Sequence, residues 1–378
     1  MANEDKAARY NRLRRRTSLL DAAVQAGLLA LFALSGTSTW LRATVESLIG
    51  TDLTPLVVVY VLSSAAFFEL AHLPFAFHER FLLERRYGLS TETVAGWAID
   101  HVKAAAMALA ALIAAGLVVA WLLRWSPAHW WLLAAIVLAA ALVLFARFAP
   151  VLLLPRFYDI RPLERDALRA RLLALTERAR TPVLGVYEWR IGSRTVKANA
   201  ALAGIGRTRR ILLSDTLLAA HSDEEIETVF AHELAHHVYG DIWSALALEA
   251  ALLTLGCYLA DVVLSTFGAT VGLTGKADVA GLPLLALTAG AASLGFMPLA
   301  NALSRTHERR ADRYALETTG NSPAFISAMK RLAATNLAEE RPSRWVEVLF
   351  HTHPSAAARI EAARAYQRPI RSDSRITR

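Results

Sequence analysis

The sequence is poor in cysteine and lysine. Cys257 is the only cysteine among 378 residues, so the chain can form no intrachain disulfide and offers no cluster of thiolates to a metal. A bound metal would therefore need histidine and carboxylate ligands. Lysine accounts for only five of the 41 basic residues, so arginine carries most of the positive charge behind the net +8.

Charged residues are also few for a soluble protein. They make up 20% of the chain, whereas 55% of it is hydrophobic and the mean hydropathy is +0.34. Several apolar runs approach the ~20 residues that a helix needs to cross a bilayer. We therefore expect an α-helical polytopic, integral membrane protein with about six transmembrane helices. The candidate spans are, approximately, 18–36, 55–78, 104–123, 130–152, 243–267 and 282–303.

Basic residues occur on alternate sides of these spans. The N-terminal segment with its "RLRRR", the loop after the second span, the central segment and the C-terminal segment are rich in arginine. The remaining loops, 37–54, 124–129 and 268–281, carry one basic residue each. This distribution follows the positive-inside rule, so we expect both termini and the central segment in the cytoplasm. It also accounts for the net charge without nucleic acid, which we do not expect as a partner.

The chain divides into two parts. Residues 1–152 are expected to form an N-terminal membrane domain with four spans. Residues 153–378 are more polar, and two further spans, about 243–267 and 282–303, interrupt them. The second part therefore combines soluble segments with membrane anchoring.

The central polar segment alternates helical and extended patterns. An amphipathic helix is predicted over 162–180, with Pro162 near its first turn. Three short runs, 183–191, 195–204 and 209–215, are punctuated by glycines. They predict a small antiparallel meander.

The stretch "FAHELAHHVYGD" lies on the next predicted helix, over 223–239. Ser222 and Glu225 form a capping-box pattern at the start of this helix. His232 and His236 lie one turn apart, so both imidazoles can bind one metal ion from the same side.

The glutamate inside this motif is suited to a different task. Glu233 lies about 100° around the helix from His232, so it can act as a base on the attacking water instead of binding the metal. The alternative interpretation is that the two histidines are exposed polar residues of an amphipathic helix. His237 lies on another face of the helix, and we interpret it as a bystander.

A catalytic zinc site needs a third protein ligand and an open fourth position. The stretch "NALSRTHERRADRYALE" offers Glu308, with Asp312 four residues later on the same helical face. Asp312 can accept a hydrogen bond from a ligand histidine and fix its tautomer. The alternatives are that Glu308 forms a surface salt bridge with a neighbouring arginine, or that His307 is the third ligand.

Five stretches together resemble one known family. They are "AHELAHHVYGD", "SRTHERRAD", "ERRYGLSTETVAGWAIDHVKAAA", "KANAALAGIGRTRRILLSDTLL" and "HTHPSAAARI". This set is similar to the integral-membrane zinc metalloproteases of the CAAX prenyl protease (Ste-type) family, which are related to HtpX-type heat-shock proteases. The resemblance covers nearly the whole chain.

The resemblance implies a site and a fold. It implies one Zn²⁺ per chain, held by His232, His236 and Glu308, with Glu233 as the catalytic glutamate. It implies a cytoplasmic α+β metalloprotease domain of gluzincin type, in which a small antiparallel sheet accompanies the HExxH helix. Residues that it implicates in holding substrate or stabilising the transition state are Asn199, His353 and Arg359.

Two of these residues also have an interpretation from their local sequence. Asn199 lies on a predicted edge strand, with which an extended peptide can pair while the side chain holds its backbone. His353 precedes Pro354, which restricts its backbone, and its imidazole can donate to a developing oxyanion. The alternatives are an asparagine beside a turn and a surface histidine without a role.

The expected function is a zinc-dependent membrane endopeptidase. The family activity removes a C-terminal tripeptide after a prenylcysteine, and a bacterial member can carry out an equivalent reaction. A protease for membrane-protein quality control, without prenyl substrates, is the alternative. A non-enzymatic membrane scaffold with a structural zinc is a third hypothesis. The expected partners are peptides or protein C-termini, lipid-modified ones included, and membrane lipids. The arginine bias favours a bacterial inner membrane, with the active site on the cytoplasmic side.

Overall fold

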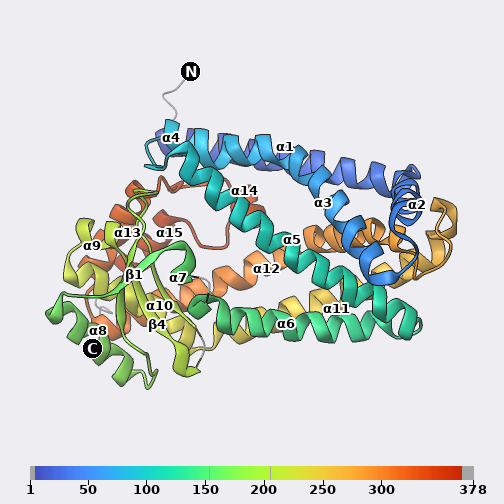
Figure 1. Cartoon of the computed structure of the whole chain (residues 1–378). Helices are drawn as coiled ribbons and strands as arrows, with labels where there is room; N and C mark the ends of the chain where they lie inside the picture. The colour runs from blue at the N-terminus through green and yellow to red at the C-terminus, as the bar shows by residue number, and fades with distance from the viewer. Residues whose placement is uncertain (1–4, 153, 205, 368–378) are drawn as a thin grey trace, which may run out of the picture.

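Six long helices set the length of the molecule (Figure 1). The computed structural model describes residues 5–152, 154–204 and 206–367. Within these residues, six helices are long and apolar enough to cross a membrane, as predicted. They are α1 (Lys6–Leu34), α3 (Leu53–Phe77, continued by the π-helix η1, His78–Leu83, and by α4, Glu84–Arg86), α5 (Val94–Trp125), α6 (Trp130–Leu152), α11 (Asp241–Phe267) and α12 (Leu282–Thr319).

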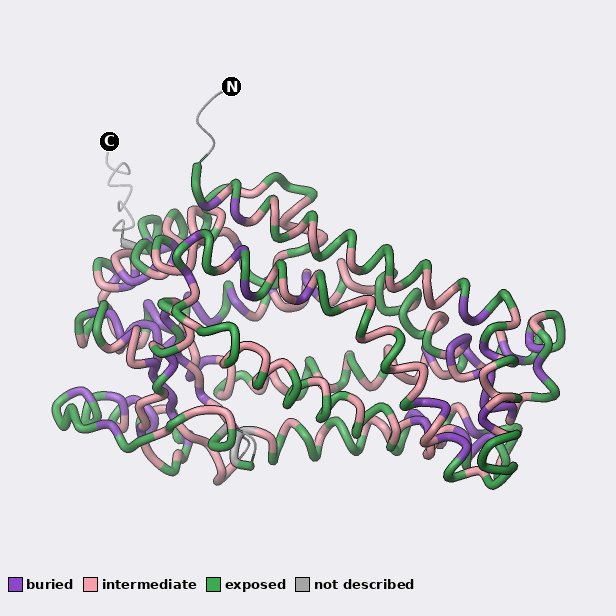
Figure 2. The backbone as a smooth tube through the Cα atoms, turned by 45° about the horizontal axis from the view of Figure 1, so that its top comes forward, coloured by how far each residue is buried: buried purple, intermediate pink, exposed green. Residues whose placement is uncertain are grey.

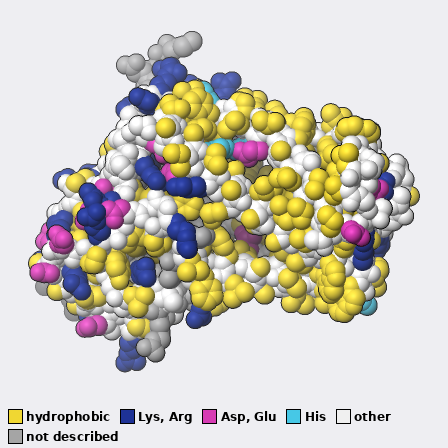
Figure 3. Space-filling model, in the orientation of Figure 1, with side chains coloured by type: hydrophobic (Ala, Val, Ile, Leu, Met, Phe, Trp, Pro, Cys, Tyr) yellow, Lys and Arg dark blue, Asp and Glu magenta, His cyan; other side chains and the backbone are white. Residues whose placement is uncertain are grey.

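Hydrophobic side chains cover the part of the molecule that these helices build. Figure 3 shows them as a broad apolar surface, with charged side chains gathered mainly over the end that carries the sheet. At most 28% of the most apolar stretch of any candidate span is buried inside the protein. An apolar surface of this size is stable in contact with lipid and unfavourable in water. The chain is an integral membrane protein.

The first span differs from the prediction at its start. Helix α1 begins at Lys6, not near residue 18, so the basic "RLRRR" sequence lies on the helix itself. The predicted loop 37–54 contains a further helix, α2 (Thr37–Ile49). Sequence hydropathy detects only the apolar part of a helix, because polar turns at its ends lower the average.

Buried residues gather at the two ends of the elongated molecule (Figure 2). At the end with α2, the Ser38 hydroxyl donates to the Ala280 carbonyl at 2.6 Å, and the Tyr60 hydroxyl lies 2.5 Å from the same Ser38 oxygen. Arg42 pairs there with the Asp278 carboxylate at 3.4 Å. These contacts join α2 and α3 to the short helix η4 (Val279–Gly281) and its N-cap residue. Helix η4 and another short helix, η3 (Ala269–Val271), lie in the connection between α11 and α12.

The opposite end holds a four-stranded mixed sheet. Its strands are β1 (Asp159–Pro162), β2 (Val186–Arg190), β3 (Ala200–Ala203) and β4 (Arg210–Ser214), in the order β1-β2-β4-β3. Strands β2 and β4 are parallel, whereas β1 with β2 and β3 with β4 are antiparallel. The predicted all-antiparallel meander is therefore wrong. The chain places β3 on the outside of β4, so β4 joins β2 in parallel.

Pro162 lies in a strand and not in the first turn of a helix as predicted. It ends β1, an edge strand, where the missing N–H of proline costs no ladder hydrogen bond. The amphipathic helix that follows, α8, is accordingly shorter than predicted, Asp166–Arg178.

Helices pack around this sheet and share its core. Buried side chains of the strands, such as Ile211 and Leu213, form one cluster with Leu172, Phe230 and Phe325 from three helices. Those helices are α8, α10 and α13. The bounds of the helices at this end not yet given are α7 (Leu154–Phe157), η2 (Gly206–Thr208), α9 (Asp215–Ala220), α10 (Asp223–Val238), α13 (Ser322–Thr335), α14 (Arg344–Phe350) and α15 (Ala356–Gln367).

Helix α10 begins where the sequence predicted. The Ser222 side chain accepts a hydrogen bond from the backbone N–H of Glu225, and the Glu225 carboxylate accepts one from the backbone N–H of Ser222. This capping box satisfies two donors that the helix cannot satisfy itself. One face of α10, which includes Phe230 and Leu234, is buried in the core. The opposite face is free to present polar side chains.

Helix α12 connects the two ends of the molecule. It has 38 residues, which corresponds to about 57 Å at 1.5 Å per residue. Its last turns reach α10, while its first turns lie beside α2 and η4 (Figure 1). The membrane part and the sheet end are therefore linked by one continuous helix.

Both described chain ends lie at the end that carries the sheet (Figure 1). We expect reporters fused to the N- and C-termini to lie in the same compartment. Six membrane crossings return the chain to its starting side. Accessibility of the reporters to a membrane-impermeant reagent measures this directly. Opposite accessibilities would show an odd number of crossings.

Candidate metal centre

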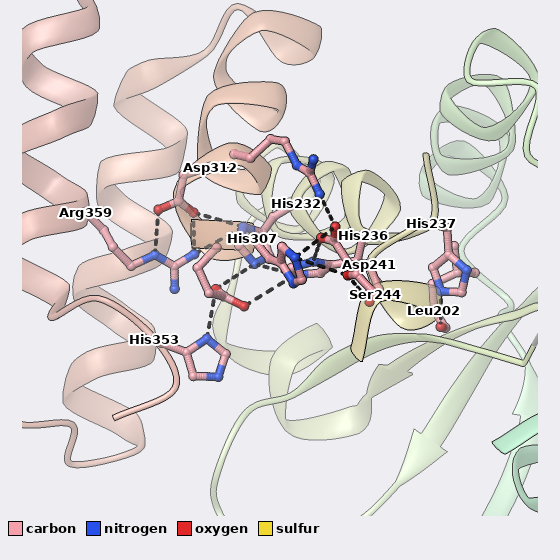
Figure 4. A network of polar contacts seen from close by, with 12 residues as sticks. Leu202, His232, His236, His237, Asp241, Ser244, His307, Asp312, His353 and Arg359 are labelled. Atoms are coloured by element: carbon pink, nitrogen blue, oxygen red, sulfur yellow. Dashed lines mark hydrogen bonds and ion pairs between the residues drawn. The ribbon is translucent and has the colours of Figure 1, made fainter. Parts of the chain in front are cut away.

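Three side chains from two helices converge beside the sheet (Figure 4). His232 and His236 come from α10, and their Nε2 atoms lie 3.3 Å apart. Glu308 comes from α12, with its carboxylate oxygens 3.2 Å from Nε2 of His232 and 3.4 Å from Nε2 of His236. One ligand atom from each residue lies within 4.8 Å of the others, a group that could hold a metal ion.

Carboxylates on the far side of each ring fix the orientation of both imidazoles. His232 Nδ1 lies 2.9 Å from an oxygen of Asp312, and His236 Nδ1 lies 2.8 Å from an oxygen of Asp241. A neutral histidine that donates from Nδ1 presents a lone pair at Nε2. With both rings neutral and in this tautomer, as metal binding requires, the two lone pairs face each other and the Glu308 carboxylate. Such convergent acceptors repel one another, and a cation between them removes the repulsion, so the residues fit a metal.

The two orienting carboxylates are themselves held by arginines. Arg359 contacts both oxygens of Asp312, from Nε at 2.9 Å and from Nη2 at 2.5 Å. Arg310 contacts Asp241. Both arginines hold the carboxylates in place, as expected for partners of metal ligands.

Asp241 was missed by the sequence analysis. It is the first residue of α11 and follows Gly240, whose φ of 69° is in the left-handed region that glycine adopts readily. This turn brings Asp241 back beside His236. The signal that could have revealed it is the Gly-Asp pair directly after the HExxH helix.

The side chain of Arg359 is largely buried. It is 15% exposed, and its guanidinium group pairs with the Asp312 carboxylate. Its Nη2 also lies 3.3 Å from Nδ1 of His232. The geometry favours a positioning contact over binding of a substrate carboxylate.

His353 lies at the open side of the cluster. Its Nδ1 is 2.8 Å from Glu308, while its side chain is 61% exposed. The loop between α14 and α15 carries it (Figure 4). One edge of its ring therefore contacts the cluster, and the rest is accessible to a ligand.

His307, the rival third ligand, points elsewhere. Its Nε2 lies 3.2 Å from the Ser244 hydroxyl and 3.9 Å from Asp241. The three-residue group of the described chain contains Glu308 and not His307.

Glu233 is the carboxylate of this site that stays free. It is half-buried, and its carboxylate has no hydrogen bond or ion pair with any other residue that the structure describes. Burial raises its pKa above the usual value, and the neighbouring His232 and His236 oppose this shift. A carboxylate with a raised pKa and no fixed partner is suited to accept a proton.

Asn199 lies directly before β3, which is an edge strand as predicted. Its backbone N–H donates to the Ser214 hydroxyl at 2.9 Å, and its carbonyl accepts from the Ser214 N–H at 2.9 Å. The Asn199 side chain is exposed. It is therefore available to a ligand beside the strand.

His237 is outside the three-residue cluster but has specific contacts (Figure 4). Its Nε2 lies 2.6 Å from the carbonyl oxygen of Leu202, and its Nδ1 accepts from Arg209 at 3.1 Å. Burial lowers the pKa of His237 to about 4, so the ring is neutral near pH 7. His237 thus joins the end of α10 to β3.

Two family models match consecutive parts of the chain. Residues 162–367 match the model described as "Peptidase family M48". Residues 2–159 match the model described as "CAAX prenyl protease N-terminal, five membrane helices". Within the described residues of that second range, four helices are long and apolar enough to span a membrane.

Relatives with known names cover most of the chain. An "Uncharacterized metalloprotease YhfN" of Bacillus subtilis is 33% identical over 73% of this chain and 66% of its own length. A "Probable CAAX prenyl protease 1" of Schizosaccharomyces pombe is 24% identical over 80% of this chain and 65% of its own. The chain thus spans about two thirds of the length of these two relatives.

A solved structure has the same fold. The crystal structure of S. mikatae Ste24p matches with a TM-score of 0.85 at 21% identity, covering 95% of this chain and 88% of that one. The predicted resemblance is confirmed for family and fold.

The third metal-binding residue can be tested by substitution. We expect Glu308→Ala to lower metal affinity by more than the about 10–100-fold typical for loss of a residue that only orients a ligand. His307→Ala, the neighbouring control, should retain the metal. Metal content after dialysis against a graded chelator series measures both. Retention by the Glu308 variant and loss by the His307 variant would reverse the assignment.

Proposed function

The chain belongs to peptidase family M48, and on that premise we propose that it is a zinc-dependent endopeptidase of the membrane. Its site is proposed to hydrolyse peptide bonds near the cytoplasmic face. The observation that carries this proposal is the free carboxylate of Glu233 beside the convergent ligands His232, His236 and Glu308. A purely structural metal site would have no need of such a group.

The ligand set supports zinc in a catalytic arrangement. Two imidazoles and one carboxylate form a His₂Glu set, which leaves a fourth position open, whereas structural zinc sites are closed by four protein ligands. Zn²⁺ bound there would supply a Lewis acid that lowers the pKa of a water molecule and polarises the substrate carbonyl. The proposed stoichiometry is one such ion per chain.

Glu233 is proposed as the general base. Its unpaired carboxylate can take the proton of the attacking water and pass it to the leaving amine. Its position next to the proposed ligand His232 on α10, with no fixed partner for its carboxylate, supports this role.

The remaining site residues are proposed to hold the reacting group. His353 presents the exposed part of its ring beside Glu308 and can donate to the carbonyl oxygen as negative charge develops there. Arg359 keeps Asp312 in position against His232. The exposed Asn199 side chain can hold the backbone of a bound peptide.

The substrate is proposed to be a peptide or a protein C-terminus at the membrane surface. The names of the eukaryotic relatives favour removal of a C-terminal tripeptide after a prenylcysteine, or a bacterial equivalent. Quality control of membrane proteins without prenyl groups is the second candidate. The arginine-rich loops support a bacterial inner membrane with the site and both termini in the cytoplasm. Cleavage of paired peptides with and without a prenyl group distinguishes the two candidates.

Substitution of the general base is the first test of the mechanism. Glu233→Gln should keep its zinc, because the ligands remain, and should lose about 10²–10⁴-fold in rate, because the base is gone. Glu227→Gln, on the same helix, is the control and should stay active. Peptide cleavage and zinc content are measured on the same preparations. A zinc-loaded Glu233→Gln variant with full activity would refute the assignment.

The role of His353 is tested by steady-state kinetics. His353→Ala should lower kcat by about 10²–10³-fold with little change in KM, as for a lost oxyanion donor. His351→Ala, two residues away in the same loop, should keep kcat. A rise in KM at constant kcat would show that His353 binds the substrate and does not stabilise the transition state.

A further inference from the structure

Four buried polar residues form one stripe along α12. They are Asn301, Arg305, Glu308 and Asp312, and each is at most 8% exposed. Spacings of four, three and four residues place them on one face of the helix. Glu308 is the candidate metal ligand and Asp312 orients His232, whereas Asn301 and Arg305 have no contact with the metal cluster. Burial of polar groups is costly unless they have partners, so the partners of these two side chains indicate what they do.

Arg305 holds the backbone at the C-terminal end of α14. Its Nη1 donates to the carbonyl oxygen of Glu347 at 3.0 Å and to that of His351 at 2.7 Å. Among the described residues, no carboxylate pairs with its guanidinium group. Carbonyl groups at the end of a helix lack partners within the helix, and a cation there satisfies them and stabilises their partial negative charge. This buried charge is therefore used on two backbone carbonyls of one segment.

Asn301 fixes the same segment from one turn earlier on α12. Its Nδ2 donates to the carbonyl oxygen of Leu349 at 2.8 Å. The two side chains together hold three carbonyl groups between residues 347 and 351. The segment cannot shift along α12 without loss of at least one of these hydrogen bonds.

This backbone leads directly to His353. Arg305 and Glu308 are three residues apart on α12, so the helix contacts the loop at the carbonyl of His351 and again at the ring of His353. The side chain of His353 is 61% exposed. Packing around the ring is therefore sparse, and its position depends mainly on the backbone that carries it.

The contacts with α12 continue beyond this loop. Arg359 of α15 pairs with Asp312, one turn after Glu308. His353 and Arg359 thus approach the cluster from the same side (Figure 4). The contacts follow the same order along both segments: 301 with 349, 305 with 351, 308 with 353 and 312 with 359. The face of α12 that carries the metal ligand therefore also fixes the segment that carries His353.

We propose that Arg305 is a positioning residue for His353, because it holds the loop at the place from which the imidazole reaches the carbonyl oxygen of a bound substrate. This inference rests on the proposed function of His353 as an oxyanion donor. Such a donor acts only within hydrogen-bond distance of the developing charge, and a displacement of about 1 Å can cost about 10²-fold in rate. Arg305 thus affects turnover through His353 and not through the metal.

A double-mutant cycle tests this coupling. Arg305→Met removes the donors and keeps a long, unbranched side chain. We expect it to lower kcat by about 10–10²-fold with little change in KM or in zinc content, because Glu308 remains. In the His353→Ala protein, which has already lost the donor, the same substitution should change kcat by no more than about 2-fold. An equal loss in both backgrounds would show that Arg305 does not act through His353 and would overturn the proposal.

Two further variants complete the test. Arg305→Lys keeps a cation that can donate to the same carbonyls, so it should lose less kcat than Arg305→Met, and it takes the place of that variant in the cycle if Arg305→Met does not fold. Arg313→Met removes an exposed arginine of the same helix and should keep the wild-type kcat. Full kcat in zinc-loaded Arg305→Met protein would overturn the proposal. Absence of any zinc-dependent cleavage by the wild-type protein would instead overturn the proposed function itself.

Discussion

The mutual repulsion of three hydrogen-bond acceptors is the constraint on which the site depends. When Nδ1–H of His232 donates to Asp312 and Nδ1–H of His236 donates to Asp241, both Nε2 lone pairs face the Glu308 carboxylate. Buried acceptors that face each other are unfavourable without a cation. The arginines behind the two aspartates maintain this arrangement from outside. The arrangement therefore suits a cation, and residues that do not contact the ion help to maintain it.

The membrane part of the fold supplies one wall of this site. Helix α12 starts at the far end of the molecule and ends with Glu308 and Asp312 against α10. The spans themselves bury little of their apolar surface in the protein, and buried residues concentrate at the two ends (Figure 2). The helix that carries the candidate ligand Glu308 is thus also a candidate membrane span.

The sequence predicted the elements that depend on local patterns and missed those that depend on long-range pairing. The shared face of His232 and His236, the pairing of Glu308 with Asp312 and the capping box of α10 follow from helical periodicity, and the structure brings His232, His236 and Glu308 together. The parallel pairing of β2 with β4 joins strands separated by β3, and no local pattern predicts such a pairing. Asp241 was missed because a turn, not a helical face, brings it to His236. His237 was interpreted as a bystander because its partner, Leu202, lies on another element.

X-ray absorption spectroscopy at the zinc edge of the purified, metal-loaded protein tests the central claim most directly. The account predicts a first shell of nitrogen and oxygen atoms at about 2.0–2.2 Å, with the signature of two imidazoles and no sulfur. Loss of imidazole scattering in a protein that carries both Asp241→Ala and Asp312→Ala should follow, because these carboxylates orient the rings. A shell of four imidazoles, or an unchanged spectrum in the double variant, would contradict the account.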